Sequence, residues 1–289
     1  LVTLGDGSSA QNALSLVPSD LVLDRTYVHA GSTTPTSRCV ALNSARTQVT
    51  DSYLHECHGK GFDTQAIASW NGPGPFKIVN NTLAGAGENL MFGGADPAIA
   101  NLIPSDIELR RNYIVTPASW KGVWTKKNLL ETKNVQRLLV EGNVFDGSWA
   151  DAQIGWAFIW KSENQSGACT WCASRDITFR YNIVRNSGSG FNLSGKEGSN
   201  PNPVGALLER VLIEQNIVEN INVGVYTGEA KFMQILQNAK DVTIRNNTMS
   251  STGAISQFFY LDAYPSVTNL YWDNNIVTHG QYAFFTSKY

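Results

Sequence analysis

The stretch Val211-Leu-Ile-Glu-Gln-Asn-Ile-Val218 contains the unit from which most of the chain is built. From Ile213 onward it runs apolar, polar, variable, Asn, variable, apolar. The same order surrounds seven asparagines spaced 28 to 39 residues apart, namely Asn81, Asn112, Asn143, Asn182, Asn216, Asn247 and Asn275. Ser52 and Thr26 continue this column upstream. A period of this size predicts a solenoid.

The segments around the asparagines have the pattern of short strands. Val211-Leu-Ile-Glu214 and Val242-Thr-Ile-Arg245 alternate apolar and polar residues and are rich in β-branched side chains. No stretch carries a long amphipathic helical stripe, and the leucines that a leucine-rich repeat needs at fixed positions are missing. The sequence therefore predicts an all-β solenoid.

The asparagines have two expected structural roles. A tight bend between strands needs a positive φ, which Asn tolerates better than other non-glycine residues. Strands of successive coils lie about 4.8 Å apart, so equivalent side chains stack and their amides can hydrogen-bond as an Asn ladder. Ordinary turn asparagines are the alternative, and seven in register argue against it.

The repeat resembles the right-handed parallel β-helix repeat of the pectate-lyase-like superfamily, from about Leu21 to Phe285. The resemblance implies a right-handed, single-stranded parallel β-helix of about nine coils with an Asn ladder. It also implies a substrate groove along the first sheet of the helix. The superfamily includes lyases, hydrolases, epimerases, esterases and binding proteins, so the resemblance does not select one activity.

Length and charge limit the partners that we expect. A solenoid of 289 residues forms one continuous domain over residues 1–289, which we expect to be part of a longer secreted protein. The net charge of -2 argues against a nucleic-acid partner, and no apolar run reaches the length of a membrane span. We expect a monomer that binds a polysaccharide.

Four cysteines favour two disulfides and a secreted, extracellular location. Cys39 and Cys57 are 18 residues apart, which suits a bridge between neighbouring rungs. Cys169-Thr-Trp-Cys172 is expected to form the second bridge in a loop. Redox or zinc chemistry at this CxxC pair and a reduced pair at Cys39 and Cys57 are the alternatives.

Six of the eight tryptophans lie within residues 120–171, where the longest gap in the Asn column also falls. Expected strands of the first sheet in and near this region include Lys121–Lys126, Trp156–Lys161 and Val223–Thr227. Aromatic rings on a flat sheet can support sugar rings, or they can fill the interior and cover loops. The predicted substrate-binding residues are Trp120, Trp124, Trp156, Trp160, Trp171 and Tyr226.

Charged residues in the same region suit two reactions. For β-elimination from an acidic glycan, Lys126, Lys161 and Lys196 could form a basic line that neutralises a carboxylate or supplies the base. For glycoside hydrolysis, Glu131 with Glu163 is one available carboxylate pair. Charges that merely solvate loops are the alternative.

We expect a polysaccharide lyase first, and a glycoside hydrolase or a non-catalytic, adhesin-like rod as alternatives. The four histidines form no metal-binding pattern, so no metal-binding residue is predicted. No cofactor is required, although Ca²⁺ is compatible with the family resemblance. The sequence motifs of polygalacturonases and the aspartate cluster of calcium-dependent pectate lyases are not found.

Overall fold

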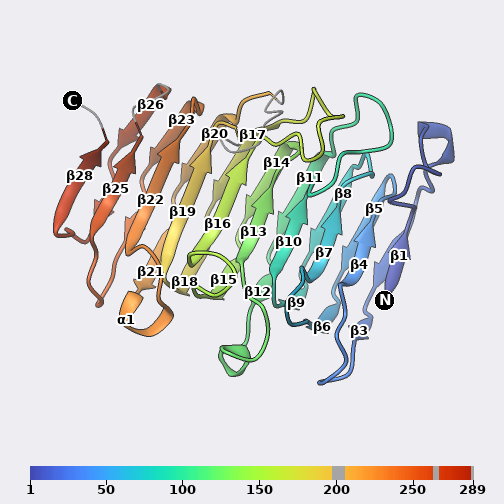
Figure 1. The fold of residues 1–289 in the computed structure, drawn as a ribbon, viewed down its shortest axis with the longest axis horizontal. Coiled ribbons are helices and arrows are strands. Elements are labelled where there is room, and N and C mark those ends of the chain that lie inside the picture. Colours follow the sequence, from blue (N-terminus) through green and yellow to red (C-terminus); the bar gives the residue numbers. More distant parts are fainter. Residues whose placement is uncertain (197–205, 263–266, 288–289) are drawn as a thin grey trace.

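The chain folds into a parallel β-helix in the computed structural model, which describes residues 1–196, 206–262 and 267–287 (Figure 1). Each complete coil contributes one strand to each of three sheets, and neighbouring strands pair in parallel. In the described residues the first sheet has ten strands, and the second and third have nine each. The predicted all-β parallel solenoid is therefore confirmed.

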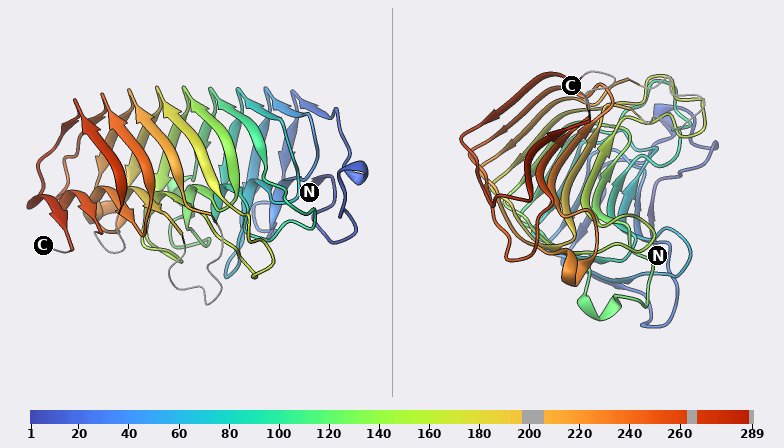
Figure 2. Two further views of the ribbon diagram at one scale, coloured as in Figure 1. Left: turned by 90° about the horizontal axis from the view of Figure 1, so that it is seen from above. Right: turned by 60° about the vertical axis from the view of Figure 1, so that its left-hand side comes forward.

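The sheets run along the whole rod, so each coil lies directly on the one before it (Figure 2). The first sheet contains β1 (Val2–Leu4), β4 (Arg38–Leu42), β7 (Gln65–Ser69), β10 (Glu88–Phe92), β13 (Asn128–Thr132), β16 (Trp156–Lys161), β19 (Ser189–Ser194), β22 (Lys231–Leu236), β25 (Gln257–Leu261) and β28 (Tyr282–Thr286).

The second sheet contains β2 (Val22–Asp24), β5 (Thr47–Thr50), β8 (Phe76–Val79), β11 (Ser105–Arg110), β14 (Val135–Glu141), β17 (Ser174–Arg180), β20 (Glu209–Glu214), β23 (Lys240–Arg245) and β26 (Thr268–Asp273). The third contains β3 (Tyr27–His29), β6 (Tyr53–Cys57), β9 (Thr82–Gly85), β12 (Tyr113–Val115), β15 (Val144–Ser148), β18 (Ile183–Ser187), β21 (Ile217–Ile221), β24 (Thr248–Met249) and β27 (Ile276–Val277).

Three short helical turns interrupt the strands: η1 (Leu14–Leu16), η2 (Ala118–Trp120) and α1 (Val223–Tyr226). Two predicted first-sheet strands, Lys121–Lys126 and Val223–Thr227, are wrong for this reason. The first is a loop after η2, and the second is α1, where the Asn222 side chain accepts a hydrogen bond from the Gly224 amide. The strands begin later, at Asn128 and Lys231.

Apolar columns fill the interior, because strict register places equivalent residues above one another. Phe158 and Phe191, from successive coils, stack with ring centroids 4.5 Å apart. One column of the first sheet consists of Val40, Ile67, Leu90, Leu130, Phe158, Phe191, Met233 and Phe259, all buried. Burial of such columns is the main favourable term that holds the coils together.

The asparagine side chains hydrogen-bond from coil to coil. Asn112 donates to Oδ1 of Asn143 through both its backbone N–H and its Nδ2, each at 2.9 Å. Asn143 binds Asn182 in the same way, at 2.9 and 3.0 Å. These contacts continue through Asn216 and Asn247 to Asn275. The side chains thus satisfy backbone groups that the bend leaves without strand partners.

The expected positive φ falls one residue earlier than predicted. Arg111, Tyr181 and Gln215, which precede Asn112, Asn182 and Asn216, have φ of 53°, 57° and 55°. None of the seven ladder asparagines is among the described residues with positive φ. The exposed preceding residue turns the corner, and this directs the asparagine side chain inward, where its amide is buried.

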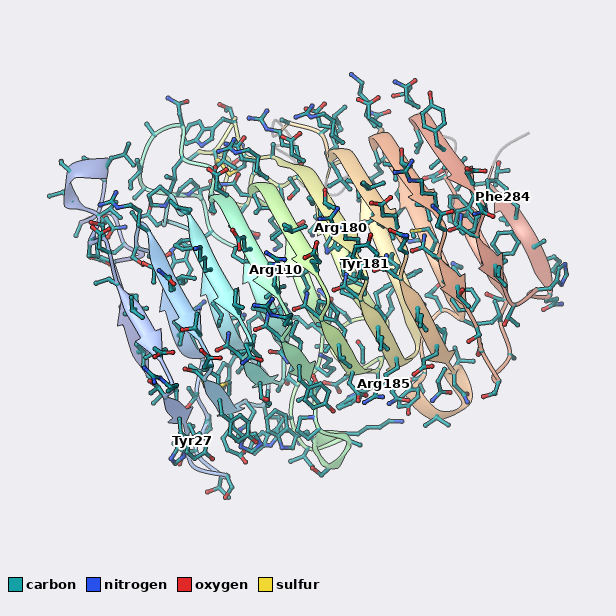
Figure 3. All side chains as sticks on the ribbon, turned by 180° about the vertical axis from the view of Figure 1, so that it is seen from behind. Tyr27, Arg110, Arg180, Tyr181, Arg185 and Phe284 are labelled. Atoms are coloured by element: carbon teal, nitrogen blue, oxygen red, sulfur yellow. A yellow bond between two sulfur atoms is a disulfide. The ribbon has the colours of Figure 1, made fainter. Side chains whose placement is uncertain are left out.

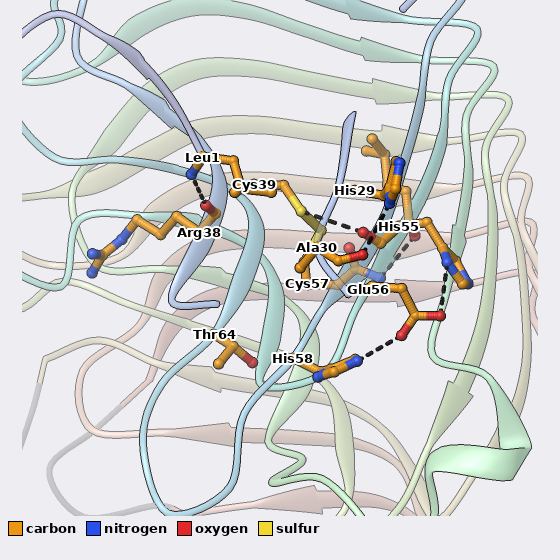
Figure 4. Close-up of a disulfide and its surroundings, with 12 residues drawn as sticks. Leu1, His29, Ala30, Arg38, Cys39, His55, Glu56, Cys57, His58 and Thr64 are labelled. Carbon is orange, nitrogen blue, oxygen red and sulfur yellow. Dashed lines mark hydrogen bonds and ion pairs between the residues drawn. A yellow bond between two sulfur atoms is a disulfide. The ribbon is translucent and has the colours of Figure 1, made fainter. Parts of the chain in front are cut away.

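Both predicted disulfides are present. Cys39–Cys57 joins β4 to β6, two strands of one coil, rather than two successive coils (Figure 4). Cys169–Cys172 lies in the loop between β16 and β17. None of the described helices has the length and apolar character needed to cross a membrane.

Candidate functional site

Charged side chains gather on the outer face of the first sheet, over β7, β10, β13 and β16. Glu88 of β10 pairs in register with Asn128 of β13, and Glu131 pairs with Met91 on one side and Ile159 on the other. We call the group made by Glu88, Lys127, Glu131, Lys133, Lys161 and Glu163 the first-sheet charge cluster.

Glu88 anchors one end of this cluster and is only 1% exposed. Its carboxylate accepts a hydrogen bond from Gln65 Nε2 at 2.8 Å and lies 3.0 Å from Lys127 Nζ. Lys127 also pairs with Asp63 at 2.6 Å. Burial lowers the pKa of Lys127, and the two carboxylates more than offset this, so its pKa is above the usual range.

Glu131 is the most perturbed carboxyl group of the cluster. It is 2% exposed, and Asn128 Nδ2 donates to it at 2.6 Å. Burial raises the pKa of Glu131, and the charge of Glu88 adds to this increase. Lys133, Lys161 and the Asn128 hydrogen bond oppose the increase without cancelling it. Glu131 therefore holds its proton to a higher pH than an ordinary glutamate does.

Lys133 connects Glu131 to a second carboxylate. Its Nζ lies 3.7 Å from Glu131 and 3.2 Å from Glu163, and Lys161 Nζ lies 2.9 Å from the same Glu163 oxygen. The paired oxygens of the two glutamates are thus no more than about 7 Å apart. Glycosidases place their two carboxyl groups roughly 5 to 9.5 Å apart. The structure therefore brings together the pair that the sequence nominated.

The predicted basic line of lysines does not form on this face. Lys126 lies before β13 and is completely buried, with Nζ donating to Thr116 Oγ1 at 2.9 Å and to the Asn128 carbonyl at 2.7 Å. Lys161 is engaged by Glu163. Lys196 follows β19, and no described contact links it to Glu131 or Glu163. The prediction was wrong because Lys126 does not belong to a first-sheet strand.

Burial gives Lys126 an unusual protonation equilibrium. Desolvation lowers its pKa from 10.5 to about 7, and the charge of Glu88 only partly opposes the shift. The Thr116 hydroxyl and the Asn128 carbonyl that accept its hydrogen bonds are both uncharged. Near neutral pH, Lys126 is therefore divided between its charged and neutral forms.

A pocket of about 270 Å³ opens beside the charge cluster. Arg38, Trp70, Met91 and Lys133 are among its lining residues. The Arg38 guanidinium lies 4.7 Å from the centroid of the Trp70 ring. Within the described part of the chain, no carboxylate forms an ion pair with Arg38, and its buried Nε has no hydrogen-bond partner. Arg38 extends away from the Cys39–Cys57 disulfide in Figure 4.

Two of the predicted aromatic platforms are completely buried. Trp160 packs in the interior against Phe158, Phe179 and Phe191. Trp156, on the outer face, is also fully buried. Neither can present a ring to a sugar in this conformation, so both predictions are wrong. The sequence shows that a Trp is present but does not show whether its ring faces inward or outward.

The other predicted aromatic residues lie away from the charge cluster. Trp120 and Trp149 form a second apolar cluster, with Trp124 and Tyr226 packed against it. Trp124 also stacks on His58, with ring centroids 4.0 Å apart. Trp171 is held in its loop by a 3.0 Å hydrogen bond from Nε1 to the Leu102 carbonyl.

Sequence reasoning did not nominate Arg38, Gln65 or Asn128 as site residues. Register provides the signal that could have found Gln65 and Asn128, because both stand at outward positions beside Glu88. Arg38 is the first residue of β4, two coils before Glu88. In the part of the chain that the structure describes, no three His, Cys, Asp or Glu side chains group as metal ligands. No ligand set for Ca²⁺ is therefore identified there.

Comparisons with known proteins add little to this geometry. No protein-family model and no curated protein matches the chain. Among solved structures, it is similar to the Streptococcus pneumoniae surface protein and adhesin PfbA, with 9% sequence identity. The match covers 90% of this chain and 85% of that one, with a TM-score of 0.46. Similarity this low carries no argument about function.

Proposed function

We propose that this protein hydrolyses a glycosidic bond in an acidic glycan, with Glu131 as the general acid. One observation carries the proposal: a buried carboxyl group of raised pKa shares Lys133 with a second carboxylate, Glu163. A glycosidase needs one carboxyl group that keeps its proton and another that serves as base or nucleophile. Different environments within one site can give two glutamates these different roles.

In the proposed reaction, Glu131, which is 2% exposed in this structure, becomes accessible when the substrate binds and donates its proton to the oxygen of the leaving sugar as the glycosidic bond breaks. Glu163 activates a water molecule or attacks the anomeric carbon itself, and the separation limit of about 7 Å admits both routes. In the first route, Glu163 takes a proton from the water, and in the second a later water molecule releases the sugar. Lys133 and Lys161 hold Glu163 in place.

Arg38 supports an acidic substrate. Among the described residues no carboxylate lies within ion-pair distance of its guanidinium, although the charges of Asp63 and Glu88 act on it, and it lines a pocket of about 270 Å³. A planar guanidinium can bind a carboxylate through two parallel hydrogen bonds. A uronic acid seated in this pocket would supply that carboxylate. Asp63, which lines the same pocket, shares Lys127 with Glu88, and Glu163 pairs with Lys133. The Arg38 guanidinium therefore remains available to pair with a carboxylate of the ligand.

A polysaccharide lyase is the second candidate, and Lys126 is the observation that favours it. A lysine with a pKa of about 7 suits removal of a proton near neutral pH. Lys126 would have to leave Thr116 and the Asn128 carbonyl to reach a substrate, because its side chain is completely buried. A rod that binds glycan without chemistry is the third candidate.

The proposal also includes the broader expectations from the sequence. We propose that the protein is a secreted monomer, that residues 1–289 form one domain, and that it is a divergent relative of the pectate-lyase-like superfamily. The two disulfides and the parallel coils support this setting. The low charge of -2 supports a glycan rather than a nucleic acid as the partner.

A polysaccharide panel tests the proposal. Purified protein is incubated with acidic and neutral polymers, and both reducing ends and the ultraviolet absorbance of unsaturated uronates are measured. We expect reducing ends from an acidic polymer without new absorbance. Glu131→Gln should lower the rate about 10²- to 10⁴-fold, the usual contribution of a general acid. Glu108→Gln, on the outer face of the second sheet, is the matched control.

The outcomes separate the three candidates. New absorbance that is lost in Lys126→Met would replace hydrolysis by elimination. Binding without either product, retained in Glu131→Gln and Glu163→Gln, would indicate a non-catalytic rod. Thermal melting of each variant checks that a lost activity does not reflect unfolding.

The pH dependence of the rate gives a second test. Glu131 must be protonated to act as an acid, and its pKa is raised by burial. The rate should therefore persist above the usual range of a carboxyl group and fall as the pH rises through the raised pKa. A rate that falls already near pH 4, as for an ordinary exposed glutamate with a pKa of about 4.3, would contradict the assigned role.

A further inference from the structure

A second hollow, of about 410 Å³, lies on the outer face of the third sheet. Tyr113, Val115 and Asp146 of β12 and β15 line it, together with Trp149 just after β15. Its other lining residues include Pro117 and Ala118, from the segment around η2, and Tyr226 of α1. It therefore uses a different sheet from the charge cluster that contains Glu131.

The two loops beside this hollow contact each other across a long sequence separation. Lys121, which follows η2, donates a hydrogen bond to the Val225 carbonyl in α1. The same ammonium lies 6.0 Å from the centroid of the Tyr226 ring. The walls of the hollow thus come from two coils that contact each other. The contacting residues, Lys121 and Val225, are 104 residues apart in the sequence.

Asp146 provides a fixed polar group in the hollow. One of its carboxylate oxygens accepts hydrogen bonds from Tyr113 Oη at 3.0 Å and from Arg185 Nε at 2.9 Å. The other accepts from Asn186 Nδ2 at 2.7 Å. A carboxylate offers about four acceptor positions, so capacity remains for a hydroxyl group of a ligand. Figure 3 shows Arg185 on this side of the rod.

Asn186 and Trp149 supply further fixed groups. Asn186, which also lines the hollow, accepts a hydrogen bond from Asn220 Nδ2 at 2.8 Å through its amide oxygen, so its orientation is set from both sides. Trp149 is 2% exposed, and its buried Nε1 has no hydrogen-bond partner among the described residues. A buried donor without a partner is costly unless a ligand or water supplies an acceptor.

The charge balance favours an uncharged ligand. Arg185 and Asp146 neutralise each other in a direct ion pair. Burial and the charge of Asp146 raise the pKa of Tyr226, so its phenol stays a hydrogen-bond donor at neutral pH. Aromatic faces beside a carboxylate and an amide match the two kinds of surface that a sugar ring presents, its apolar C–H face and its hydroxyl edge.

We propose that this hollow binds a neutral sugar residue of a glycan chain, separately from the charge cluster of the first sheet. Tyr226 packs against the ring with the buried Trp149 behind it, while Asp146 and Asn186 bind its hydroxyl groups. The proposal does not depend on hydrolysis by Glu131, because it concerns a different sheet and a different chemistry. It gives the protein two glycan contacts, one that prefers an acidic sugar and one that prefers a neutral sugar.

Binding of neutral oligosaccharides tests the proposal. Gluco-, manno- and galacto-oligosaccharides are titrated into the whole protein, and the indole N–H signals are followed by NMR. We expect saturable binding to one of these series, with a shift of the Trp149 Nε1–H signal. Tyr226→Ala should weaken the affinity about tenfold or more, as removal of a central aromatic contact does at other binding sites.

Two variants keep the result interpretable. Tyr271→Ala removes a 61% exposed tyrosine from the outer face of the second sheet and should leave the affinity unchanged. Asp146→Asn keeps the side-chain shape and should also weaken binding. Unchanged affinity in Tyr226→Ala, or no binding to any neutral series, would overturn the proposal. Because only binding is measured, this outcome is independent of whether Glu131 catalyses hydrolysis.

Discussion

The charged residues of the second sheet repeat from coil to coil, whereas the glutamates of the first-sheet charge cluster are buried and do not repeat. On the second sheet, Arg110, Glu141, Arg180, Glu214 and Arg245 alternate in sign from one coil to the next and are in register. Arg110 and Arg180, both labelled in Figure 3, bind Glu141 at 2.6 and 2.7 Å while remaining 35% and 37% exposed. On the first sheet, Glu88 and Glu131 are 1% and 2% exposed, and their pattern does not repeat.

The difference indicates which charges need a functional explanation. In this ladder the arginines remain 35% to 47% exposed. Ion pairs with such exposed partners contribute little to stability, and the pattern extends easily by one more coil. Buried charges carry a large desolvation cost that their partners only partly offset. A solenoid can fill the outer positions of its sheets with small or apolar residues instead. Burying charged residues there therefore gives the fold no added stability. The unrepeated, buried cluster is therefore the better marker of a site.

Removal of Lys133 should have the largest effect on stability. Lys133→Met leaves Glu131 without its ammonium partner and Glu163 with only one of the two described here. We expect a loss of about 3 to 5 kcal/mol near pH 8, the typical cost of breaking a buried ion pair. Urea unfolding measures it. The loss should shrink at low pH, where the carboxyl groups are neutral.

The control for this variant is Lys77→Met, which removes an exposed lysine from β8 of the second sheet. It should change the free energy of unfolding by less than about 0.5 kcal/mol. Equal losses in the two variants would remove the contrast between the faces.

Lys126 should change how stability depends on pH. Its pKa is about 7 in the folded protein against 10.5 for an unperturbed lysine, so between these values the unfolded chain binds the additional proton. Stability should therefore rise with pH across this window relative to Lys126→Met, by about 4 kcal/mol between pH 7 and pH 10. Melting curves of both proteins from pH 6 to about pH 10 follow the difference. Parallel curves would show that Lys126 is not desolvated as described.

Glu141 should give the smallest effect. Glu141→Gln removes the charge that Arg110 and Arg180 share on the second sheet, and the hydrogen-bond acceptor is retained. We expect a loss of about 0.2 to 1 kcal/mol that becomes smaller in about 1 M salt. A loss as large as that of Lys133→Met, or one that salt does not reduce, would mean that both faces follow the same rule.

The regular parts of the fold were predictable because they repeat. The Asn column located the bends, and the strand pattern located first-sheet strands such as Trp156–Lys161. The segments around η2 and α1 were not predictable, because Val223-Gly-Val-Tyr226 has the composition of a strand. Its helical turn has the adjacent Asn222 as its cap and is contacted by Lys121, which is 104 residues away from Val225 and could not be foreseen from the local sequence.

The same distinction holds for the site. Glu131 and Glu163 could be nominated from the sequence because the repeat places them in successive coils. The structure adds that Lys133 pairs with both. Arg38 and Trp70 could not, since the pocket that they line depends on how the glycine-containing turn after β10 folds back. Trp160 could have faced either side of its strand, and only the packing of Phe158, Phe179 and Phe191 decides it.

The Asn ladder also determines how the rod can open. The backbone N–H of Asn112 or Asn143 is held by a side chain of the following coil, so it is released to solvent only when two coils separate. Deuterium uptake at these amides would therefore measure coil separation rather than local fluctuation. In a molecule where each coil contacts only its neighbours, such uptake should begin at the terminal coils and advance inward, one coil at a time.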